Sequence, residues 1–365
     1  MRTIIIYMVM ALSIIVLLAG ALIWYTGGTI FFIGKMVSYE SIISNSICLS
    51  PKRDKLTFAV MGGKVLGFRG IDIFITELGT GITQQITNDG MSQGPYWSNE
   101  SAIIFESVNK GLSELYFIDV PHLKRSLLQV GGAGNNNLAT AYYRPRVALS
   151  GDTLLFERYE IDKARNVFTI TLCRYDLKTK QIDTLETLVD QANVNARDTF
   201  TDIGGHSGYL WQISPNGDMV VVLKDSVLYE VNLINKNKSV IIKDKEIENF
   251  DYTPTNIALL VRSGNHKQLL WIQTLHDTYN TMVTRGEGRY ADPKWSPSGK
   301  FLAYADLDSK IIWIFNVKTA KSQKLVEGYS PIWINNEQLL VRRGKAELFS
   351  VSIDGKAVRR LFPPT

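Results

Sequence analysis

Seven polar and aromatic residues stand ahead of a recurring short segment that contains Pro or Trp. They are Gln93, Tyr143, Arg144, His206, Asn249, Asp292 and Tyr329. The set combines a guanidinium, a carboxylate, amides and aromatic rings, which is typical of a site for a small polar ligand, a glycan or a peptide terminus. We therefore take them as candidate ligand-binding residues, provided that the fold brings them together.

Residue patterns that would indicate catalysis or a metal are missing from the sequence. The segment Gly205-His206-Ser207-Gly208 shares only its composition with a nucleophile elbow. The four histidines, His122, His206, His266 and His276, fall in different segments without the spacing of metal ligands. We therefore expect no catalytic residue, no metal and no cofactor, and we predict that the chain is not an enzyme.

A polar segment at residues 190–205 is longer than the surrounding pattern requires. It supplies side-chain oxygens from Asp190, Asn193, Asn195, Asp198 and Asp202. Their spacing matches no defined calcium loop. A solvated loop, a calcium site and a contact for a partner protein are the three interpretations that remain open.

The elements that would position these residues are short strands, repeated at a nearly constant period. The clearest repeat is 290–328, where a Pro-x-Trp-Ser strand turns at Ser296-Pro297-Ser298-Gly299 and three further strands follow within about 40 residues. Pro sets φ for such a tight turn and Gly supplies positive φ. Related segments cover 47–90, 91–132, 142–187, 208–245, 247–288 and 329–362.

This pattern predicts an all-β fold, a single β-propeller of seven four-stranded blades at residues 47–365, with six blades as the alternative. Trp97, Trp211, Trp295 and Trp333 recur in the first strand, and we expect them to be wedges between blades. Residues just ahead of the first-strand Pro or Trp would then lie near the mouth of the central channel. The alternative is that this mouth is simply polar and hydrated.

The repeat also resembles a known family. Ser-Pro-x-Gly followed by an apolar strand, and Asp72-Ile73-Phe74-Ile75 leading into a Gly-containing hairpin, look like the TolB-type propeller repeat. That repeat is also found in the propeller domains of prolyl oligopeptidase-like peptidases. The resemblance covers nearly all of residues 47–362 and is specific for the fold. It implies protein–protein interaction in the cell envelope.

The N-terminal segment is expected to be a membrane anchor. Residues 3–34 contain no charged side chain, and residues 4–25 supply the roughly 20 apolar residues that a transmembrane helix needs. We assign residues 1–35 to a single-pass anchor and its flank, with a removed signal peptide as the alternative. Residues 36–46 would be a linker or a strand that closes the ring. The slight positive-inside bias places the propeller in the periplasm or the extracellular space.

The net charge of +5 includes no dense Lys/Arg run, so we expect no nucleic acid partner. The sequence thus predicts a membrane-anchored, extracytoplasmic propeller that is a non-catalytic scaffold for other envelope or membrane proteins. The alternative is a receptor for a glycan, a peptide or a small polar ligand at the channel mouth. A propeller lyase or hydrolase is the third interpretation.

Overall fold

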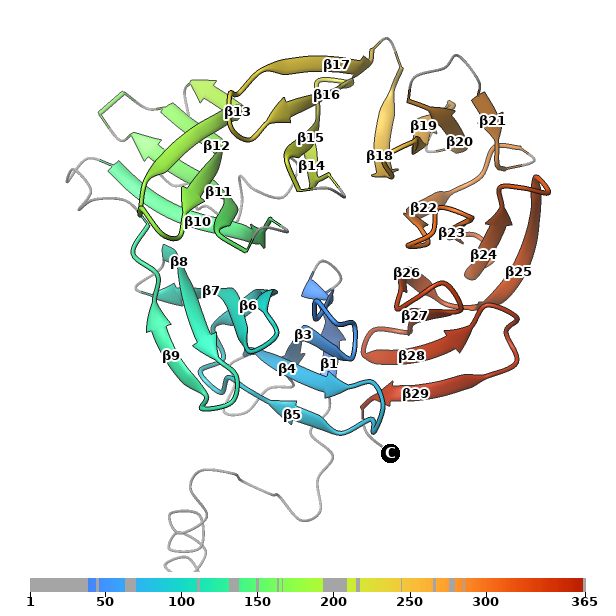
Figure 1. The fold of residues 1–365 in the computed structure, drawn as a ribbon, viewed down its shortest axis with the longest axis horizontal. Coiled ribbons are helices and arrows are strands. Elements are labelled where there is room, and N and C mark those ends of the chain that lie inside the picture. Colours follow the sequence, from blue (N-terminus) through green and yellow to red (C-terminus); the bar gives the residue numbers. More distant parts are fainter. Residues whose placement is uncertain are drawn as a thin grey trace, which may run out of the picture. The chain divides into compact units, whose positions relative to one another are not determined.

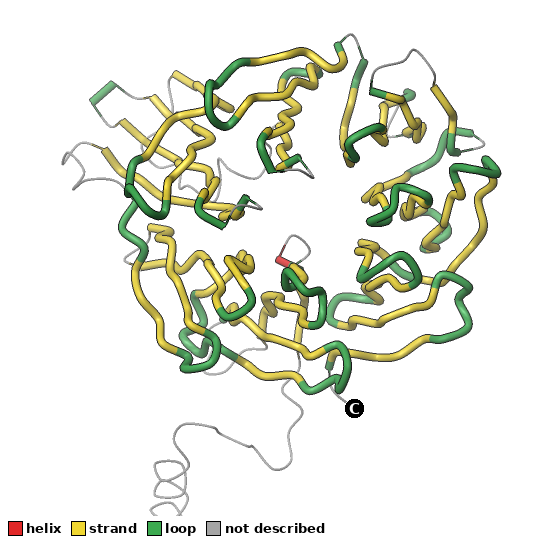
Figure 2. Tube along the Cα trace, in the orientation of Figure 1, coloured by secondary structure: helices red, strands yellow, loops and turns green. Residues whose placement is uncertain are grey.

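The computed structural model describes residues 39–43, 46–62, 70–109, 112–130, 138–148, 151–162, 164–165, 167–192, 209–214, 217–243, 245–264, 267–275, 280–284 and 286–363. They lie in one compact unit, Tyr39–Thr365. The elements of this unit are β-strands joined by turns and loops (Figure 2).

The strands form seven antiparallel sheets, each made from consecutive segments of the chain. The first three sheets contain β1 (Tyr39–Ile42), β2 (Cys48–Leu49), β3 (Lys55–Gly62), β4 (Ile71–Glu77) and β5 (Thr83–Gln85); β6 (Ser92–Asn99), β7 (Ala102–Asn109), β8 (Leu112–Asp119) and β9 (Lys124–Leu127); and β10 (Leu138–Val147), β11 (Thr153–Asp162), β12 (Val167–Asp176) and β13 (Ile182–Ala192).

The other four sheets contain β14 (Tyr209–Ile213), β15 (Met219–Lys224), β16 (Val227–Asn232) and β17 (Lys238–Ile242); β18 (Ile247–Tyr252), β19 (Asn256–Arg262), β20 (Gln268–Thr274) and β21 (Asn280–Met282); β22 (Tyr290–Trp295), β23 (Phe301–Asp306), β24 (Ile311–Asn316) and β25 (Lys321–Glu327); and β26 (Tyr329–Trp333), β27 (Gln338–Arg343), β28 (Glu347–Ser352) and β29 (Val358–Phe362).

The sheets are the blades of a seven-bladed propeller (Figure 1). In each blade the first strand lies nearest the axis and the last forms the outer edge of the ring. The prediction of an all-β propeller with seven four-stranded blades is confirmed, and the alternative of six is wrong. The first blade differs slightly, because the short strands β1 and β2 share the inner edge of β3.

Apolar second and third strands hold the ring together. In β23, for example, four consecutive residues from Leu302 to Ala305 are buried. Both faces of such a strand are covered because neighbouring blades stack on each other. The core is accordingly divided into seven hydrophobic clusters, one at each seam between adjacent blades.

Three of the four first-strand tryptophans are buried wedges at these seams. Trp97, Trp295 and Trp333 are each less than 10% exposed. The indole Nε1 of Trp333 donates to the carbonyl of Lys294 at 2.8 Å, and that of Trp295 donates to the carbonyl of Asp251 at 3.3 Å. Each of these two bonds reaches the first strand of the preceding blade, so the wedge also sets the spacing between inner strands.

The expected membrane anchor at residues 4–25 lies outside the described residues. Among the residues that the structure does describe, no helix has the length and apolar character needed to cross a membrane. Of the expected linker or closing strand at 36–46, the part from Tyr39 to Ile42 is β1, which pairs with β3 in the first blade. It meets the last blade through one backbone bond, from Ile42 N–H to the Lys345 carbonyl at 2.8 Å.

Within the described residues, the ring therefore closes without a strand shared between its first and last blades. All four strands of the last blade come from the C-terminal part of the chain. The seam is filled by apolar side chains, with the Phe362 ring edge-on to Phe58 at 4.9 Å and close to Phe74 at 5.7 Å. Three guanidinium groups add bonds, from Arg53 to the Trp333 carbonyl at 3.0 Å, from Arg359 to the Gly79 carbonyl at 2.9 Å and from Arg342 to the Ile42 carbonyl at 3.3 Å.

We predict that Phe362→Ala opens this seam. Phe362 is fully buried, so the variant should lose about 3–5 kcal/mol of unfolding free energy through lost transfer energy and an unfilled cavity. The matched control is Val358→Ala on the same strand, where the side chain is 43% exposed and the change should stay within about 0.5 kcal/mol. Urea denaturation followed by tryptophan fluorescence measures both. Equal stability of the two variants would show that closure does not depend on this packing.

Candidate functional site

The inner strands surround a cavity of about 600 Å³ on the ring axis. All seven blades contribute to its lining, from Ile47 in the first to Arg342 in the last. It is therefore the central channel, and its walls are made mostly by first-strand residues. Any ligand in it would contact several blades at once.

Bulges in the first strands turn particular side chains toward this channel. The pairing register shifts between Tyr143 and Arg146 and between Ala291 and Lys294, and a comparable shift occurs in β6, β18 and β26. Arg144 and Asp292 within these bulges have φ of 52° and 51°. Non-Gly residues rarely adopt this left-handed conformation, and it re-aims the side chain. Both side chains line the channel.

Two buried glutamates stand behind the bulges of neighbouring blades. Glu106 on β7 is paired with Gln93, and Glu157 on β11 is paired with Tyr143. They are 5% and 0% exposed. The residues at the corresponding pairing position of the fourth to seventh blades are Leu223, Leu260, Ala305 and Arg342. Burying a carboxylate is costly, so the glutamates at this position of the second and third blades need a reason. That reason is a third residue, which both of them hold in place.

That third residue is Arg144, which the two glutamates hold from both ends. Its backbone N–H donates to Glu106 Oε1 at 2.6 Å, across the seam between the second and third blades. Its guanidinium Nη1 donates to Glu157 Oε1 at 3.1 Å. Gly94 makes room for this arrangement, because a Cβ there would lie 2.6 Å from Glu106 Oε1. The position of Arg144 is therefore set before any ligand arrives.

Glu157 extends the network into the fourth blade. Its Oε1 accepts a hydrogen bond from Trp211 Nε1 at 2.7 Å, and its Oε2 accepts one from the Tyr159 hydroxyl at 3.1 Å. Trp211 lines the channel. As expected of a wedge, it packs against the hydrophobic cluster at the seam between the third and fourth blades, but it is only partly buried and its side chain also faces the channel. Ile213, two residues later, has the pairing position that Trp97 has in its own blade.

The opposite wall, from the sixth and seventh blades, is also polar. The Ser330 hydroxyl donates to Asp292 Oδ2 at 3.0 Å, and the ammonium of Lys294 is paired with Asp251 Oδ1 at 3.1 Å. Arg342 donates from Nη1 to the Ile42 carbonyl at 3.3 Å. These bonds fix the side chains at the wall.

Cationic side chains outnumber carboxylates in the channel lining, although Arg144 and Lys294 are paired with Glu157 and Asp251 behind the wall. The described lining contains four cationic side chains, Arg144, Arg146, Lys294 and Arg342, but one carboxylate, Asp292. The guanidinium of Arg146 lies over the Tyr96 ring at 4.9 Å. A cleft of one sign with low-dielectric walls focuses the field and raises the local concentration of counter-ions. The arrangement favours an anionic group, and Arg144 can bind carboxylate or phosphate with its planar fork.

Burial and charge shift the titration of groups around Arg144. Burial raises the pKa of Glu106 to about 7, with the nearby Glu157 adding to the rise and the Arg144 N–H and the Arg146 and Arg144 charges opposing it. Burial and the Glu106 charge raise the pKa of Tyr143 to about 12. Glu106 therefore exchanges its proton near neutral pH, while Tyr143 stays a neutral phenol.

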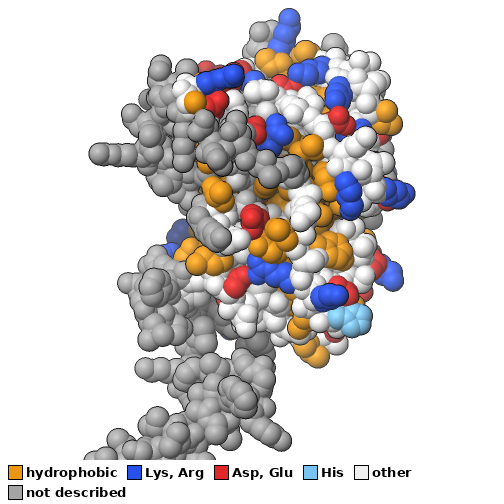
Figure 3. Space-filling view, turned by 90° about the vertical axis from the view of Figure 1, so that its left-hand side faces the viewer, with side chains coloured by type: hydrophobic (Ala, Val, Ile, Leu, Met, Phe, Trp, Pro, Cys, Tyr) orange, Lys and Arg blue, Asp and Glu red, His pale blue; other side chains and the backbone are white. Residues whose placement is uncertain are grey.

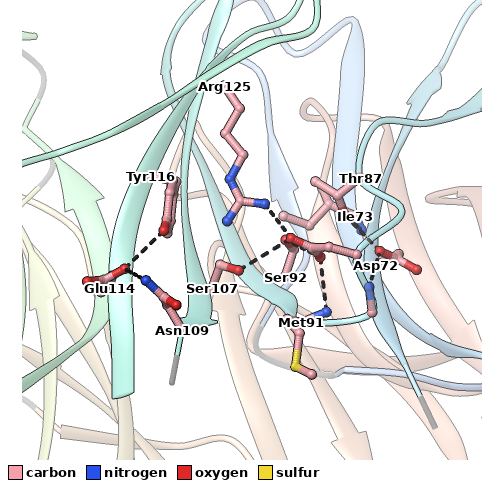
Figure 4. A network of polar contacts seen from close by, with 12 residues as sticks. Asp72, Ile73, Thr87, Met91, Ser92, Ser107, Asn109, Glu114, Tyr116 and Arg125 are labelled. Atoms are coloured by element: carbon pink, nitrogen blue, oxygen red, sulfur yellow. Dashed lines mark hydrogen bonds and ion pairs between the residues drawn. The ribbon is translucent and has the colours of Figure 1, made fainter. Parts of the chain in front are cut away.

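A polar network fixes the start of β6, which carries Gln93 and Gly94 (Figure 4). Asp89 Oδ1 accepts from the Met91 N–H at 3.0 Å and the Ser92 hydroxyl at 2.8 Å, and Oδ2 accepts from Arg125. Burial opposes ionisation here, but these bonds lower the pKa of the Asp89 carboxyl overall. The Asp89 carboxylate thus holds the segment that links the first and second blades against the second blade.

The adjoining carboxylate, Asp72, completes that connection (Figure 4). Its Oδ1 accepts from the Gly90 N–H at 3.1 Å and the Thr87 hydroxyl at 3.2 Å. Burial raises the pKa of Asp72. Both carboxylates hold backbone and neighbouring side chains, and we assign them to structure rather than to ligand binding.

The seven residues predicted from the sequence are only partly brought together. Arg144, Asn249 and Asp292 line the channel, whereas Gln93, Tyr143 and Tyr329 are absent from its described lining. Gln93 donates from Nε2 to Glu106 Oε2 at 3.2 Å, and Tyr143 packs edge-on to Tyr159 at 4.6 Å. Tyr329 begins β26 opposite Arg342. His206 lies outside the described residues.

The sequence reasoning missed Glu106, Glu157, Arg146, Lys294 and Arg342. A signal for the glutamates was present, because the apolar runs Ile103-Ile104-Phe105 and Leu154-Leu155-Phe156 both end in Glu, unlike the other repeats. No group of His, Cys, Asp and Glu among the described residues could hold a metal ion. The polar segment at 190–205, for which a solvated loop, a calcium site and a partner contact are open, is described only as far as residue 192.

The outer surface does not suggest a nucleic acid partner on the side where the second and third blades lie. There, the described Lys and Arg side chains are interspersed with Asp and Glu, and hydrophobic side chains lie between them (Figure 3). A phosphate backbone would favour a continuous basic stripe.

Neither a protein-family model nor a curated protein matches the sequence. Solved structures do match. The oligogalacturonate lyase of Vibrio parahaemolyticus is 14% identical with a TM-score of 0.58, and 89% of each chain is covered. The β-propeller domain of the Trilobed protease from Pyrococcus furiosus, which has an open velcro topology, is 12% identical with a TM-score of 0.60, over 91% of this chain and all of that domain.

A third neighbour is the acylaminoacyl peptidase of Pyrococcus horikoshii, with 11% identity and a TM-score of 0.63. The match covers 89% of this chain but 53% of the peptidase, so this chain spans about half of its length. At these identities the likeness shows the fold alone. It agrees with the propeller that the resemblance to the TolB-type repeat implied.

The prediction that the chain is not an enzyme is wrong, because it excluded a class of protein in which this fold occurs. Peptidases, a puromycin hydrolase and a lyase are among the structures that share this fold. The channel of this chain draws its lining from all seven blades, and residues so far apart in the sequence need not form a recognisable linear motif. The absence of catalytic sequence motifs therefore does not exclude an enzyme.

The raised pKa of Glu106 predicts a pH dependence of stability. An isolated Glu titrates near 4.5 and Glu106 near 7, so in this window the native state keeps a proton that the unfolded state releases. The free energy of unfolding contributed by this group therefore falls as pH rises, by about 3 kcal/mol in total. Glu106→Gln should remove that slope, as measured by urea denaturation from roughly pH 5 to pH 8.

The exposed Glu337 provides the control, because Glu337→Gln should leave the slope of the wild type in place. If the Glu106→Gln and wild-type curves stay parallel across the range, Glu106 does not titrate near neutral pH.

Proposed function

We propose that the protein is a receptor that binds the anionic group of a small ligand in its central channel. The observation that carries the proposal is Arg144, held in a left-handed bulge by two buried glutamates from adjacent blades. The ligand's carboxylate or phosphate pairs with the Arg144 guanidinium. Arg146 and Arg342 provide a favourable field, to which Lys294, already paired with Asp251, adds less.

Aromatic side chains next to the cations suit a ligand that also has an apolar face. Trp211 and Tyr96 line the same cavity as Arg144. Sugar rings and peptide side chains both have such faces, and a uronic acid or a peptide C-terminus supplies the carboxylate. The lyase neighbour is named for an acidic saccharide, which makes an oligogalacturonate a reasonable first probe.

We predict that Arg144→Ala weakens binding of a carboxylate ligand by about tenfold to a hundredfold, the range for hydrogen bonds to charged groups. The affinity of Arg144→Lys should lie between those of the wild type and Arg144→Ala, because lysine keeps the positive charge but lacks the planar guanidinium. Isothermal titration calorimetry with a galacturonic acid trimer and a tripeptide measures the affinity. Arg262→Ala, at an exposed arginine paired with Glu248, is the matched control and should bind like the wild type.

Uncharged analogues separate the two sources of the carboxylate. If the ligand is an acidic saccharide, a neutral galactose trimer should bind at least about tenfold more weakly than the galacturonic acid trimer. If the ligand is a peptide C-terminus, the same loss should be seen for an amidated tripeptide compared with the free tripeptide. Ultraviolet absorbance of the mixtures would reveal an unsaturated uronide if the saccharide is also cleaved. The proposal fails if neither charged probe binds, or if Arg144→Ala binds as tightly as the wild type.

We also propose that residues 4–25 anchor the propeller in a membrane, where its loops contact other envelope proteins. Supporting this is the apolar run in the sequence, long enough for one span. We predict that the full chain stays in the membrane fraction after an alkaline carbonate wash, whereas a chain lacking residues 1–35 is recovered in the supernatant. Release of the full chain by the wash would contradict anchoring.

A further inference from the structure

A second cavity lies at the seam between the fifth and sixth blades. Its volume is about 190 Å³, and Tyr290, Tyr304, Trp313 and Asp306 are among the residues that line it. None of its described lining residues also lines the central channel. The cavity is smaller than a pocket for a drug-sized ligand, so it suits a single compact chemical group.

Three aromatic rings form much of this wall. Tyr304 on β23 and Trp313 on β24 are direct cross-strand partners, so their side chains lie on the same face of the sixth blade. Tyr290 meets Tyr304 with ring centroids 5.9 Å apart and planes at 79°. This is an edge-to-face contact, so one ring covers a face of the other and the remaining ring faces are those that a ligand could meet. The faces of such rings are electron-rich and attract cations.

One carboxylate accompanies the rings. Asp306 ends β23, and its Oδ1 accepts the N–H groups of Asp308 and Ser309 at 3.0 and 3.1 Å. Among the described residues, no Lys or Arg forms an ion pair with Asp306, whereas its neighbour Asp308 is paired with Arg289 at 2.6 Å. Burial and the charges of these two aspartates raise the pKa of Tyr290. The pocket therefore has a negative field and neutral rings.

The protein itself already places a cation near one of these rings. Lys324 on β25 is opposite Trp313 in the sheet, and its Nζ lies 5.6 Å from the Trp313 ring centroid. Lys324 does not belong to the lining of the cavity. A cation inside the pocket would therefore share the attraction of Trp313 and be repelled by the Lys324 ammonium.

We propose that this pocket binds an organic cation, namely a methylated or quaternary ammonium group. The rings supply cation–π attraction and Asp306 supplies the opposite charge. A hard metal ion is disfavoured, because Ca²⁺ takes six to eight oxygen ligands and the described lining offers one carboxylate, two phenols and two hydroxyls. A ligand with a buried apolar surface and a delocalised positive charge fits this composition.

The test uses the full chain and choline, with the uncharged carbon isostere dimethylbutanol as the matched probe. Isothermal titration calorimetry and the shift of indole resonances in NMR spectra measure binding. Choline should bind at least about tenfold more tightly than its isostere, since cation–π attraction acts only on the charged form. Equal binding of the two, or no binding of choline, would overturn the proposal.

Three variants then distinguish this site from a general hydrophobic cleft. Asp306→Asn and Trp313→Leu should each weaken choline binding by about tenfold. Lys324→Met should strengthen it by about threefold, because the competing ammonium is removed. The matched control is Asp308→Asn, an exposed neighbour already paired with Arg289, which should weaken binding much less, by under about threefold. If Asp306→Asn and Asp308→Asn have the same effect, the pocket does not recognise the cation through Asp306.

Discussion

The structure depends on burying both faces of every blade, which only a closed ring can do. Each hydrophobic cluster belongs to a seam between two blades, so an open ring would expose one full face at each end. Here the described parts of the first and last blades meet without exchanging a strand. The Phe58, Phe74 and Phe362 cluster and a few guanidinium bonds hold that seam instead. The width of the channel, and with it the distance between opposite walls, follows from this closure.

The same seams carry the polar network of the channel. Glu106, Arg144, Glu157 and Trp211 come from three consecutive blades, and each bond between them except the pairing of Arg144 with Glu157 crosses a seam. Burying carboxylates usually costs more than their pairing returns. That cost is reduced here because each glutamate accepts at least two hydrogen bonds. The result is a guanidinium whose direction is set by the scaffold, which lowers the ordering cost of binding an anion.

Two sites of opposite electrostatic character thus occupy different parts of one ring. The channel has four cations in its described lining, while the pocket between the fifth and sixth blades combines aromatic rings with a carboxylate. Both are made by side chains that the repeat leaves variable, on strands whose backbone the repeat specifies. Variation at these positions is tolerated because the seams are held by the apolar residues around them.

The period of short strands, the Ser-Pro-Ser-Gly turn and the recurring tryptophans were enough to predict the seven-bladed propeller, because turn geometry and alternating burial are local properties. They also identified Arg144, Asn249 and Asp292 as residues near the channel. Sequence alone could not show that Trp211 lies in the channel, that Glu106 contacts a residue of the next blade, or that Tyr290, Tyr304 and Trp313 meet Asp306. These contacts depend on how strand register and bulges align one blade with its neighbour. Only the closed ring decides that alignment.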